Sequence, residues 1–272
     1  LSVTHSGVNS ASGGKLDPSF NGMHESDGRE IVMFKAVYLD MGGVILGVDP
    51  QYSRTESILY SIRTKTVRRF LGEDLNIDRF VSFISETIDN GVYRVNAMDQ
   101  GDSWRSLIVA LRAFTQREPS HRAIRQMYWD QIAYLQQHLF IYPHAFGALR
   151  ELASMGLRIG LISNVFHPSI IYRELLSKYR ILDVFDPLVY SSDLRFKKPD
   201  RRIFEYAMAR HSDLHACESM FIGDTYDVDI VGAIQAGMFP VWLNRKQSTD
   251  NHHGVAEIVS LEELPDFVRD HR

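Results

Sequence analysis

The sequence has few of the features that mark secreted, membrane or nucleic-acid-binding proteins. Its single cysteine, Cys217, cannot form an internal disulfide, so a reducing compartment, the cytoplasm, is the expected location. No apolar run approaches the ~20 residues of a membrane span, and no basic segment leads into an apolar one as in a secretory signal. The net charge of −4 shows no basic excess, so neither a nucleic-acid nor a membrane partner is expected.

The chain is long enough for one large domain, or for a core with a smaller inserted domain. It has 272 residues, of which 44% are hydrophobic and 24% charged, as in ordinary globular proteins. Residues 1–32 are instead rich in Gly, Ser, Asn and Asp without a hydrophobic period, and we expect a disordered leader there. Met33 stands directly before the first apolar run and is a candidate natural start.

One short stretch joins a predicted buried strand to an acidic side chain. The apolar run at 37–39 leads into Asp40, and Gly42 and Gly43 follow before a second apolar run at 44–46. In open α/β sheets, ligands bind outside the carboxyl ends of the strands. Asp40 is therefore a candidate nucleophile or metal ligand, and the simpler alternative is a turn carboxylate.

From residue 142 onward, strand-like and helix-like segments alternate, which is typical of a parallel sheet covered by helices. We therefore predict an α/β fold class with a doubly wound parallel sheet, in a core domain formed by residues 33–47 and 141–272. The expected helices cover 144–155, 168–179, 201–210 and 228–236, and the expected strands cover 157–162, 184–190, 219–222 and 240–243, with a further candidate at 258–259.

The segment between the first strand and this alternating region has a different pattern. Apolar residues recur three or four positions apart, without the alternation of a β-strand. We predict an inserted all-helical cap domain over residues 48–140, and Ser120 is a plausible N-cap within it. The expected helices of this insertion cover 53–71, 77–90, 103–117 and 120–137.

Polar side chains occur at the predicted strand ends or in the loops beside them: Asp40, Ser163, Lys198, Asp224 and Asp229. A parallel sheet brings such positions to one edge. A carboxylate can attack phosphorus, carboxylates with a backbone carbonyl form an oxygen site suited to Mg²⁺, and a lysine stabilises the negative charge that develops. This set predicts phosphoryl chemistry.

Each of these residues also has a simpler interpretation. Asp224 and Asp229 lie near the start of a predicted helix, where a carboxylate is stabilised by the helix dipole alone. Ser163 could serve only to satisfy backbone groups. Lys197 is a direct rival of Lys198 for the role of the cation.

Four motifs in order resemble the haloacid dehalogenase-like hydrolase superfamily over residues 34 to about 265. They are LDMGGV, LISNV, FKKPDRRIF and FIGDTYDVDIVGAIQAGM. The resemblance is to subfamily I, whose C1-type helical cap corresponds to the insertion at 48–140. It implies a Rossmann-like core and a Mg²⁺-dependent phosphomonoesterase that acts on a small phosphorylated metabolite, such as a sugar phosphate, through an aspartyl-phosphate.

The resemblance also implies residue roles. Asp40 is the expected nucleophile, and Ser163 and Lys198 are the other expected catalytic residues. Gly42, Gly43, Ser163, Asn164 and Lys198 are expected to bind the substrate. The expected ligands of Mg²⁺ are Asp40, the backbone carbonyl of Gly42, Asp224 and Asp229.

Gly42 is the departure from the family pattern, because most phosphatases of the superfamily carry a second Asp there as general acid and base. Such help is typically worth about 10²–10⁴ in rate. A cap residue, a water or a histidine (His144 and His167 are candidates) could supply the proton, or the substrate could have a readily leaving group such as an anomeric oxygen. The alternatives are a 2-haloacid dehalogenase, a non-catalytic phosphate-binding protein and a mutase.

Overall fold

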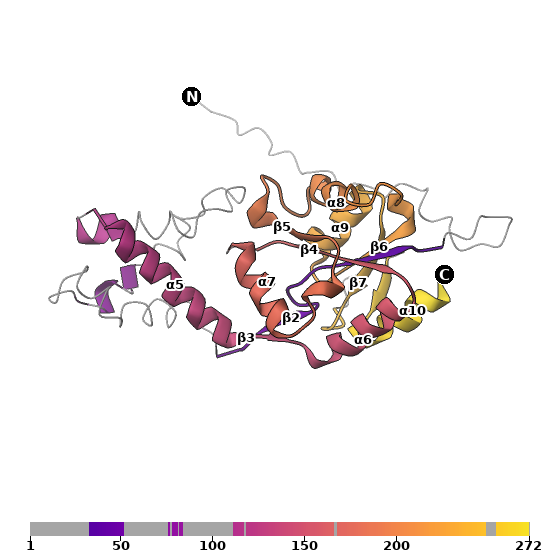
Figure 1. The fold of residues 1–272 in the computed structure, drawn as a ribbon, viewed down its shortest axis with the longest axis horizontal. Helices are drawn as coiled ribbons and strands as arrows, with labels where there is room; N and C mark the ends of the chain where they lie inside the picture. The colour runs from indigo at the N-terminus through magenta and orange to yellow at the C-terminus, as the bar shows by residue number, and fades with distance from the viewer. Residues whose placement is uncertain are drawn as a thin grey trace, which may run out of the picture.

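A six-stranded parallel sheet forms the centre of the protein (Figure 1). The computed structural model describes residues 33–51, 76, 78–80, 82–83, 111–116, 118–165, 168–248 and 254–271. Every pairing in the sheet is parallel, which confirms the predicted fold class. The strands, in their order across the sheet, are β5 (Leu188–Tyr190), β4 (Arg158–Ser163), β1 (Ala36–Leu39), β6 (Ser219–Gly223), β7 (Phe239–Leu243) and β8 (Ala256–Ile258).

Helices cover both faces of this sheet, and the central strand β1 contributes to both cores. Val37 and Leu39 join the core that includes α6 (Pro143–Ser154), α7 (Ser169–Lys178) and α10 (Leu264–Asp270). Ala36 and Tyr38 point the other way, into the core with α8 (Arg201–Met208) and α9 (Val231–Gln235). Successive side chains of a strand face opposite sides, so a strand buried on both faces is apolar throughout, as β1 is.

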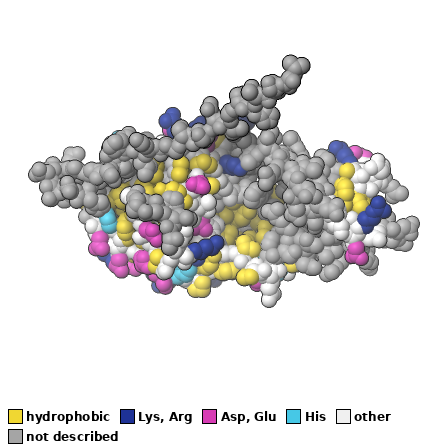
Figure 2. Space-filling view, turned by 180° about the vertical axis from the view of Figure 1, so that it is seen from behind, with side chains coloured by type: hydrophobic (Ala, Val, Ile, Leu, Met, Phe, Trp, Pro, Cys, Tyr) yellow, Lys and Arg dark blue, Asp and Glu magenta, His cyan; other side chains and the backbone are white. Residues whose placement is uncertain are grey.

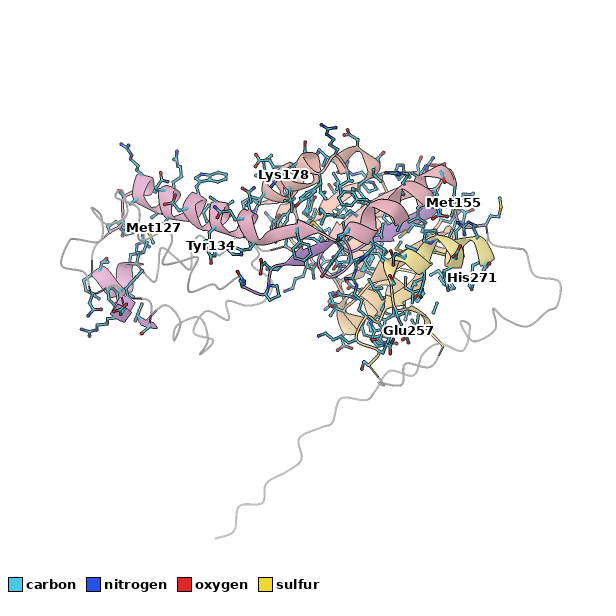
Figure 3. All side chains as sticks on the ribbon, turned by 90° about the horizontal axis from the view of Figure 1, so that it is seen from below. Met127, Tyr134, Met155, Lys178, Glu257 and His271 are labelled. Carbon is cyan, nitrogen blue, oxygen red and sulfur yellow. The ribbon has the colours of Figure 1, made fainter. Side chains whose placement is uncertain are left out.

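The predicted insertion joins the core through two short strands. β2 (Leu46–Val48) and β3 (Leu139–Ile141) form an antiparallel ribbon, which the sequence analysis did not anticipate. α5 (His121–His138) leads into β3 and extends away from the sheet, with Met127 and Tyr134 along its length (Figure 3). Ser120 is its N-cap, since its hydroxyl accepts a hydrogen bond from the N–H of Ala123 at 3.2 Å, as predicted.

Helix is also found at 78–80, 82–83 and 111–115 within the predicted insertion. The predicted helix at 53–71, most of those at 77–90 and 103–117, and the predicted leader lie outside the described residues. The division into core and cap stays a prediction. None of the helices in the part of the chain that the structure describes is long and apolar enough to cross a membrane.

Two predicted elements differ from those observed. The strand expected at 184–190 forms only at Leu188–Tyr190, because Pro187 cannot donate a ladder hydrogen bond, and Leu182–Val184 forms a 3₁₀ turn. The helix expected at 228–236 begins as a π-helical turn at Tyr226–Ile230 and continues as α9.

On the face shown in Figure 2, hydrophobic side chains gather near the middle, and acidic and basic side chains lie scattered around them.

Candidate active site

The register of the sheet places three functional positions at one edge. Leu39 of β1 pairs with Leu161 of β4 on one side and with Ile222 of β6 on the other. Asp40 therefore begins just beyond β1, while Ser163 ends β4 and Asp224 follows β6. The N–H of Asp40 still donates to the carbonyl of Ile222 at 2.9 Å, so the first residue of the loop remains fixed to the neighbouring strand.

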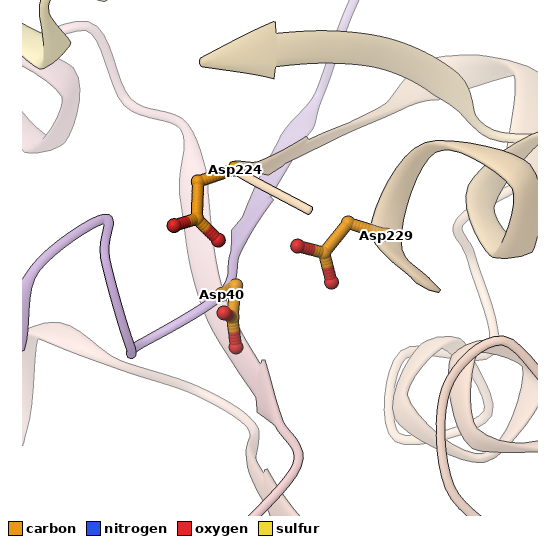
Figure 4. Close-up of side chains that lie close together, drawn as sticks. All are labelled: Asp40, Asp224 and Asp229. Carbon is orange, nitrogen blue, oxygen red and sulfur yellow. The ribbon is translucent and has the colours of Figure 1, made fainter. Parts of the chain in front are cut away.

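Three carboxylates converge at this edge. One oxygen from each of Asp40, Asp224 and Asp229 lies within 4.8 Å of the others, and Figure 4 shows the three side chains turned toward one another. Two glycines make this approach possible, because a Cβ added to Gly223 would lie 2.2 Å from Cβ of Asp229 and one added to Gly43 would lie 1.9 Å from Oδ2 of Asp224. The structure thus brings the predicted acidic residues together.

Lys198 supplies the positive charge among them. Its Nζ lies 2.8 Å from Oδ1 of Asp40 and 2.7 Å from Oδ1 of Asp229, and the residue is only 2% exposed. Lys197 is half-buried, and no ion pair of its own is found among the described residues. The geometry therefore favours Lys198 over its neighbour as the cation that faces the candidate nucleophile.

Burial dominates the electrostatics of the cluster. It raises the pKa of Asp40 from 3.8 to about 6, the ammonium of Lys198 acts in the opposite direction, and the charge of Asp229 adds to the rise. Burial also raises the pKa of Asp224, again with a contribution from Asp229. Burial disfavours the charged form of Lys198, but the two adjacent carboxylates outweigh it and raise the pKa of the ammonium. Lys198 is therefore charged.

Asn164 holds the backbone that presents this lysine. Its Nδ2 donates to the carbonyl of Lys198 at 2.9 Å, and its Oδ1 accepts from the N–H of Lys198 at 3.0 Å. The side-chain amide is thus engaged at both ends by one residue. Its predicted contact with the substrate stays a prediction, and the contact that the structure does provide is with the lysine.

Further residues that the sequence analysis missed fix the two acids beyond β6. The hydroxyl of Thr225 donates to Oδ1 of Asp224 at 3.1 Å, and its N–H donates to Oδ2 of Asp229 at 3.0 Å. The indole N–H of Trp242 donates to the backbone carbonyl of Asp224 at 3.1 Å. Thr225 lies within the last of the four motifs, between the two acids, so the sequence could have indicated its role. Nothing local in the sequence indicates Trp242.

The oxygen atoms of this cluster suit Mg²⁺, a hard cation that prefers carboxylate and carbonyl ligands. The carboxylate of Asp40 is paired with Lys198 and also accepts from the backbone N–H of Met41. Asp224 accepts from the hydroxyl of Thr225 and from its own backbone N–H, whereas Asp229 is engaged by Lys198 and by the N–H of Thr225. Asp224 is the carboxylate of the three that forms no ion pair among the described residues, so it is the best placed as a direct ligand.

Gly42 follows the strand that leads to Asp40, and Ser163 ends β4, as the sequence analysis expected. Gly42 is exposed, and a Cβ added there would meet nothing within 4 Å. Ser163 is buried at the end of β4. His144, a candidate proton donor, lies in the first turn of α6, and its Nε2 contacts Arg245, while His167 falls outside the described residues.

We expect substitution by alanine to destabilise the protein at Gly43 but not at Gly42. Gly43→Ala places a Cβ against Asp224, and its φ of +71° alone costs about 1–2 kcal/mol for a residue with a side chain. We expect a lower unfolding temperature together with a large loss of activity. Gly42→Ala, in open space and outside the left-handed region, is the matched control and should unfold like the wild type; equal unfolding temperatures for the two variants would contradict the close contact of Gly43 with Asp224.

Several known proteins resemble this chain in sequence or in fold. A family model described as a haloacid dehalogenase-like hydrolase matches residues 34–237. The glyceraldehyde 3-phosphate phosphatase of Methanocaldococcus jannaschii is 26% identical over 230 residues, covering 84% of this chain and 96% of that protein. A solved HAD phosphatase from Thermococcus onnurineus is 25% identical, with a TM-score of 0.56 over 86% of this chain and 98% of that one. A 2-haloacid dehalogenase from Pseudomonas syringae pv. Tomato has a TM-score of 0.62 and 22% identity, over 88% and 100% of the two chains, a likeness that shows the fold alone.

Proposed function

The chain belongs to the haloacid dehalogenase-like hydrolases, and from that premise we propose that it is a Mg²⁺-dependent phosphomonoesterase acting on a small phosphorylated metabolite. The observation that carries the proposal is the buried contact between Asp40 and Lys198, with Asp224 beside it. A relative named as a phosphatase over nearly its whole length supports the same reaction class.

In the proposed reaction, a carboxylate oxygen of Asp40 forms a bond to phosphorus while the ester P–O bond breaks. The leaving oxygen departs with the bonding electrons and takes a proton from solvent or from a donor group beside the substrate. An oxygen of water then bonds to the phosphorus of the aspartyl-phosphate while the P–O bond to Asp40 breaks, and the water's proton passes to solvent, which leaves inorganic phosphate and the free carboxylate of Asp40. Lys198 neutralises charge on the phosphoryl group, and fixed charge of this kind is usually the largest catalytic contribution.

Asp229 has a supporting part in this scheme. Its carboxylate at 2.7 Å keeps the buried ammonium charged and oriented, while Asn164 fixes the backbone of the same lysine. Ser163 and the backbone N–H groups at Gly42 and Gly43 are the proposed contacts for phosphoryl oxygens. Lys198 is thus held through both its side chain and its main chain.

Asp40, Asp224 and the carbonyl of Gly42 are the proposed ligands of Mg²⁺, with Asp229 close to the same point. When bound, the ion supplies a positive charge that offsets the repulsion between a phosphate dianion and the carboxylates. The close approach of Gly43 to Asp224 places that carboxylate beside the nucleophile loop. The residues present therefore fit the ion.

We further propose that residues 48–140 form a C1-type cap that closes over the substrate and excludes water, as lids of such sites do. The β2–β3 ribbon supplies its two connections to the core. A reducing compartment and the absence of nucleic-acid and membrane partners stay predictions from the sequence.

The deciding experiment is a screen of phosphorylated metabolites and an aryl phosphate, with Mg²⁺ and with EDTA. We expect phosphate release that requires Mg²⁺, and folded protein that releases none across the panel would overturn the proposal. A parallel arm measures halide release from 2-haloacids without metal. That arm should be negative, because Asp224, which forms no ion pair with any described residue, is an acid suited to a metal.

A further inference from the structure

An arginine beyond β7 reaches across the edge of the sheet to the loop that follows the candidate nucleophile. Nη2 of Arg245 donates to the carbonyl of Val44 at 2.9 Å and to Nε2 of His144 at 3.1 Å. Its guanidinium carbon lies 4.2 Å from the ring centroid of Tyr142, a cation–π distance. None of the four motifs contains this residue.

The loop that Arg245 contacts is a tight turn whose carbonyls are held from outside. Within it, the N–H of Gly43 donates to the carbonyl of Leu46 and the N–H of Leu46 donates to that of Met41. The carbonyls of Val44 and Ile45 point outward, and they accept from Arg245 at 2.9 Å and from the N–H of Tyr142 at 2.9 Å. Two successive carbonyls of the turn are thus fixed to other segments.

The loop after β7, which carries Arg245, is held in place by its own hydrogen bonds. Asn244 is only 3% exposed, and its Nδ2 donates to the carbonyl of Ser248 and to Oε1 of Glu257. Its Oδ1 accepts from the N–H of Ser248. The backbone N–H of Asn244 pairs with the carbonyl of Ile258 at 2.9 Å, which anchors the loop to the outermost strand.

His144 is the second hydrogen-bond partner of Arg245, and this contact fixes the tautomer of its imidazole. A guanidinium is a donor only, so Nε2 of His144 must accept and the imidazole is neutral, with its proton on Nδ1. Burial and the nearby Arg245 lower the pKa of His144, while Glu262 acts in the opposite direction. The ring also lies 5.3 Å from that of Tyr142, nearly parallel at 12°. His144 therefore serves Arg245 as an acceptor.

We propose that Arg245 is a positioning residue for the phosphatase reaction, which holds the turn at 41–46, and with it the backbone of Gly42 and Gly43, in the geometry that the substrate and the metal require. This inference rests on the proposed function. A displacement of about 1 Å far from the chemistry can cost about 10²-fold in rate, and loss of Arg245 releases the carbonyl of Val44 from its only recorded side-chain donor among the described residues.

The test compares Arg245→Met, Arg245→Lys and Arg210→Met with the wild type. Arg210 is a matched control, because its guanidinium also stacks on a tyrosine, Tyr206, at 4.9 Å but does not contact the turn. We expect Arg245→Met to lower kcat about 10–10²-fold and to raise the Mg²⁺ concentration needed for half activation. Arg245→Lys, which keeps one donor, should recover part of the loss, and Arg210→Met should behave as the wild type.

Amide hydrogen exchange of the folded, full-length protein provides a readout that does not depend on turnover. Arg245→Met should accelerate exchange in the peptide that covers 41–46 about tenfold, with a fall of only about 2–5 °C in the unfolding temperature. Unchanged exchange at 41–46, or an unchanged kcat, would overturn the proposal, as would a fall in kcat that Arg210→Met reproduces. If the wild type proves inactive, the proposed phosphatase fails and the exchange result still decides whether Arg245 holds the turn.

Discussion

Asp40→Asn should reduce phosphate release by about 10³-fold or more, because removal of a nucleophile eliminates the covalent step itself. Asparagine has the same shape as aspartate, and its Oδ1 can still accept from Lys198, so the local structure should persist. The measurement is kcat/KM with an aryl phosphate at saturating Mg²⁺. Asp227→Asn is the control, since Asp227 is an exposed acid two residues from Asp229 and should leave the rate unchanged.

The same substitution should not lower stability in the absence of metal. Burial raises the pKa of Asp40 to about 6 in the folded state from 3.8, so ionisation of this carboxyl opposes folding. This loss of folding free energy through ionisation of Asp40 is fully present above pH 6. It decreases as the pH falls toward 3.8 and is absent below that pH. In EDTA, Asp40→Asn should therefore unfold at or above the wild-type temperature at pH 8, and the two should converge near pH 4.

An inactive Asp40→Asn variant that unfolds several degrees below the wild type at pH 8 would indicate a structural role in place of a nucleophile. Activity that survives in this variant would contradict the proposed mechanism outright. Stability gained by removing a buried charge from a site is the usual sign that the site is organised for reaction at some cost to folding.

Gly42→Asp should increase the hydrolysis of simple alkyl phosphates by about 10²–10⁴-fold, the usual contribution of a general acid and base. The position can accept a side chain, because its added Cβ meets no atom within 4 Å and its backbone lies outside the left-handed region. A carboxyl at this point stands two residues from Asp40, where it can give a proton to the leaving oxygen. Aryl phosphates, whose leaving groups need little protonation, should gain far less.

The measurement is the rate across esters of graded leaving-group pKa, for the wild type, Gly42→Asp and Gly42→Ala. We expect a steep dependence in the wild type and in Gly42→Ala, and a shallow one in Gly42→Asp. Gly42→Ala separates the effect of filling space from that of adding an acid. A shallow dependence already in the wild type would show that another group donates the proton, and it would remove the reason to favour activated leaving groups such as anomeric phosphates.

The fold was largely predictable because its elements have local causes. The continuous apolar run of β1 and the glycines after α6 and α9 could be seen in the sequence. The ribbon of β2 and β3 was missed, because three-residue strands carry no measurable period and their partners are separated by the entire insertion. The break before β5 followed from Pro187, whose effect on hydrogen bonding could have been weighed.

The candidate site divides in the same way. Asp40, Lys198, Asp224 and Asp229 follow from strand ends and motifs, and the structure brings them together as that logic expects. Arg245 could not be found, because its partner Val44 lies 201 residues away in sequence and a single arginine after a strand has no distinguishing pattern.

The β2–β3 ribbon makes the insertion modular. Val48 pairs with Leu139, and the N–H of Asp49 donates to the carbonyl of His138 at 2.8 Å, so the two ends of residues 49–138 meet within one hydrogen bond. In topological terms the whole segment is the loop of a hairpin whose stem is the β2–β3 ribbon. Such a segment can lengthen, shorten or be exchanged without altering the path of the sheet, and under the proposed role of the cap this would let substrate preference change independently of the residues that carry out the reaction.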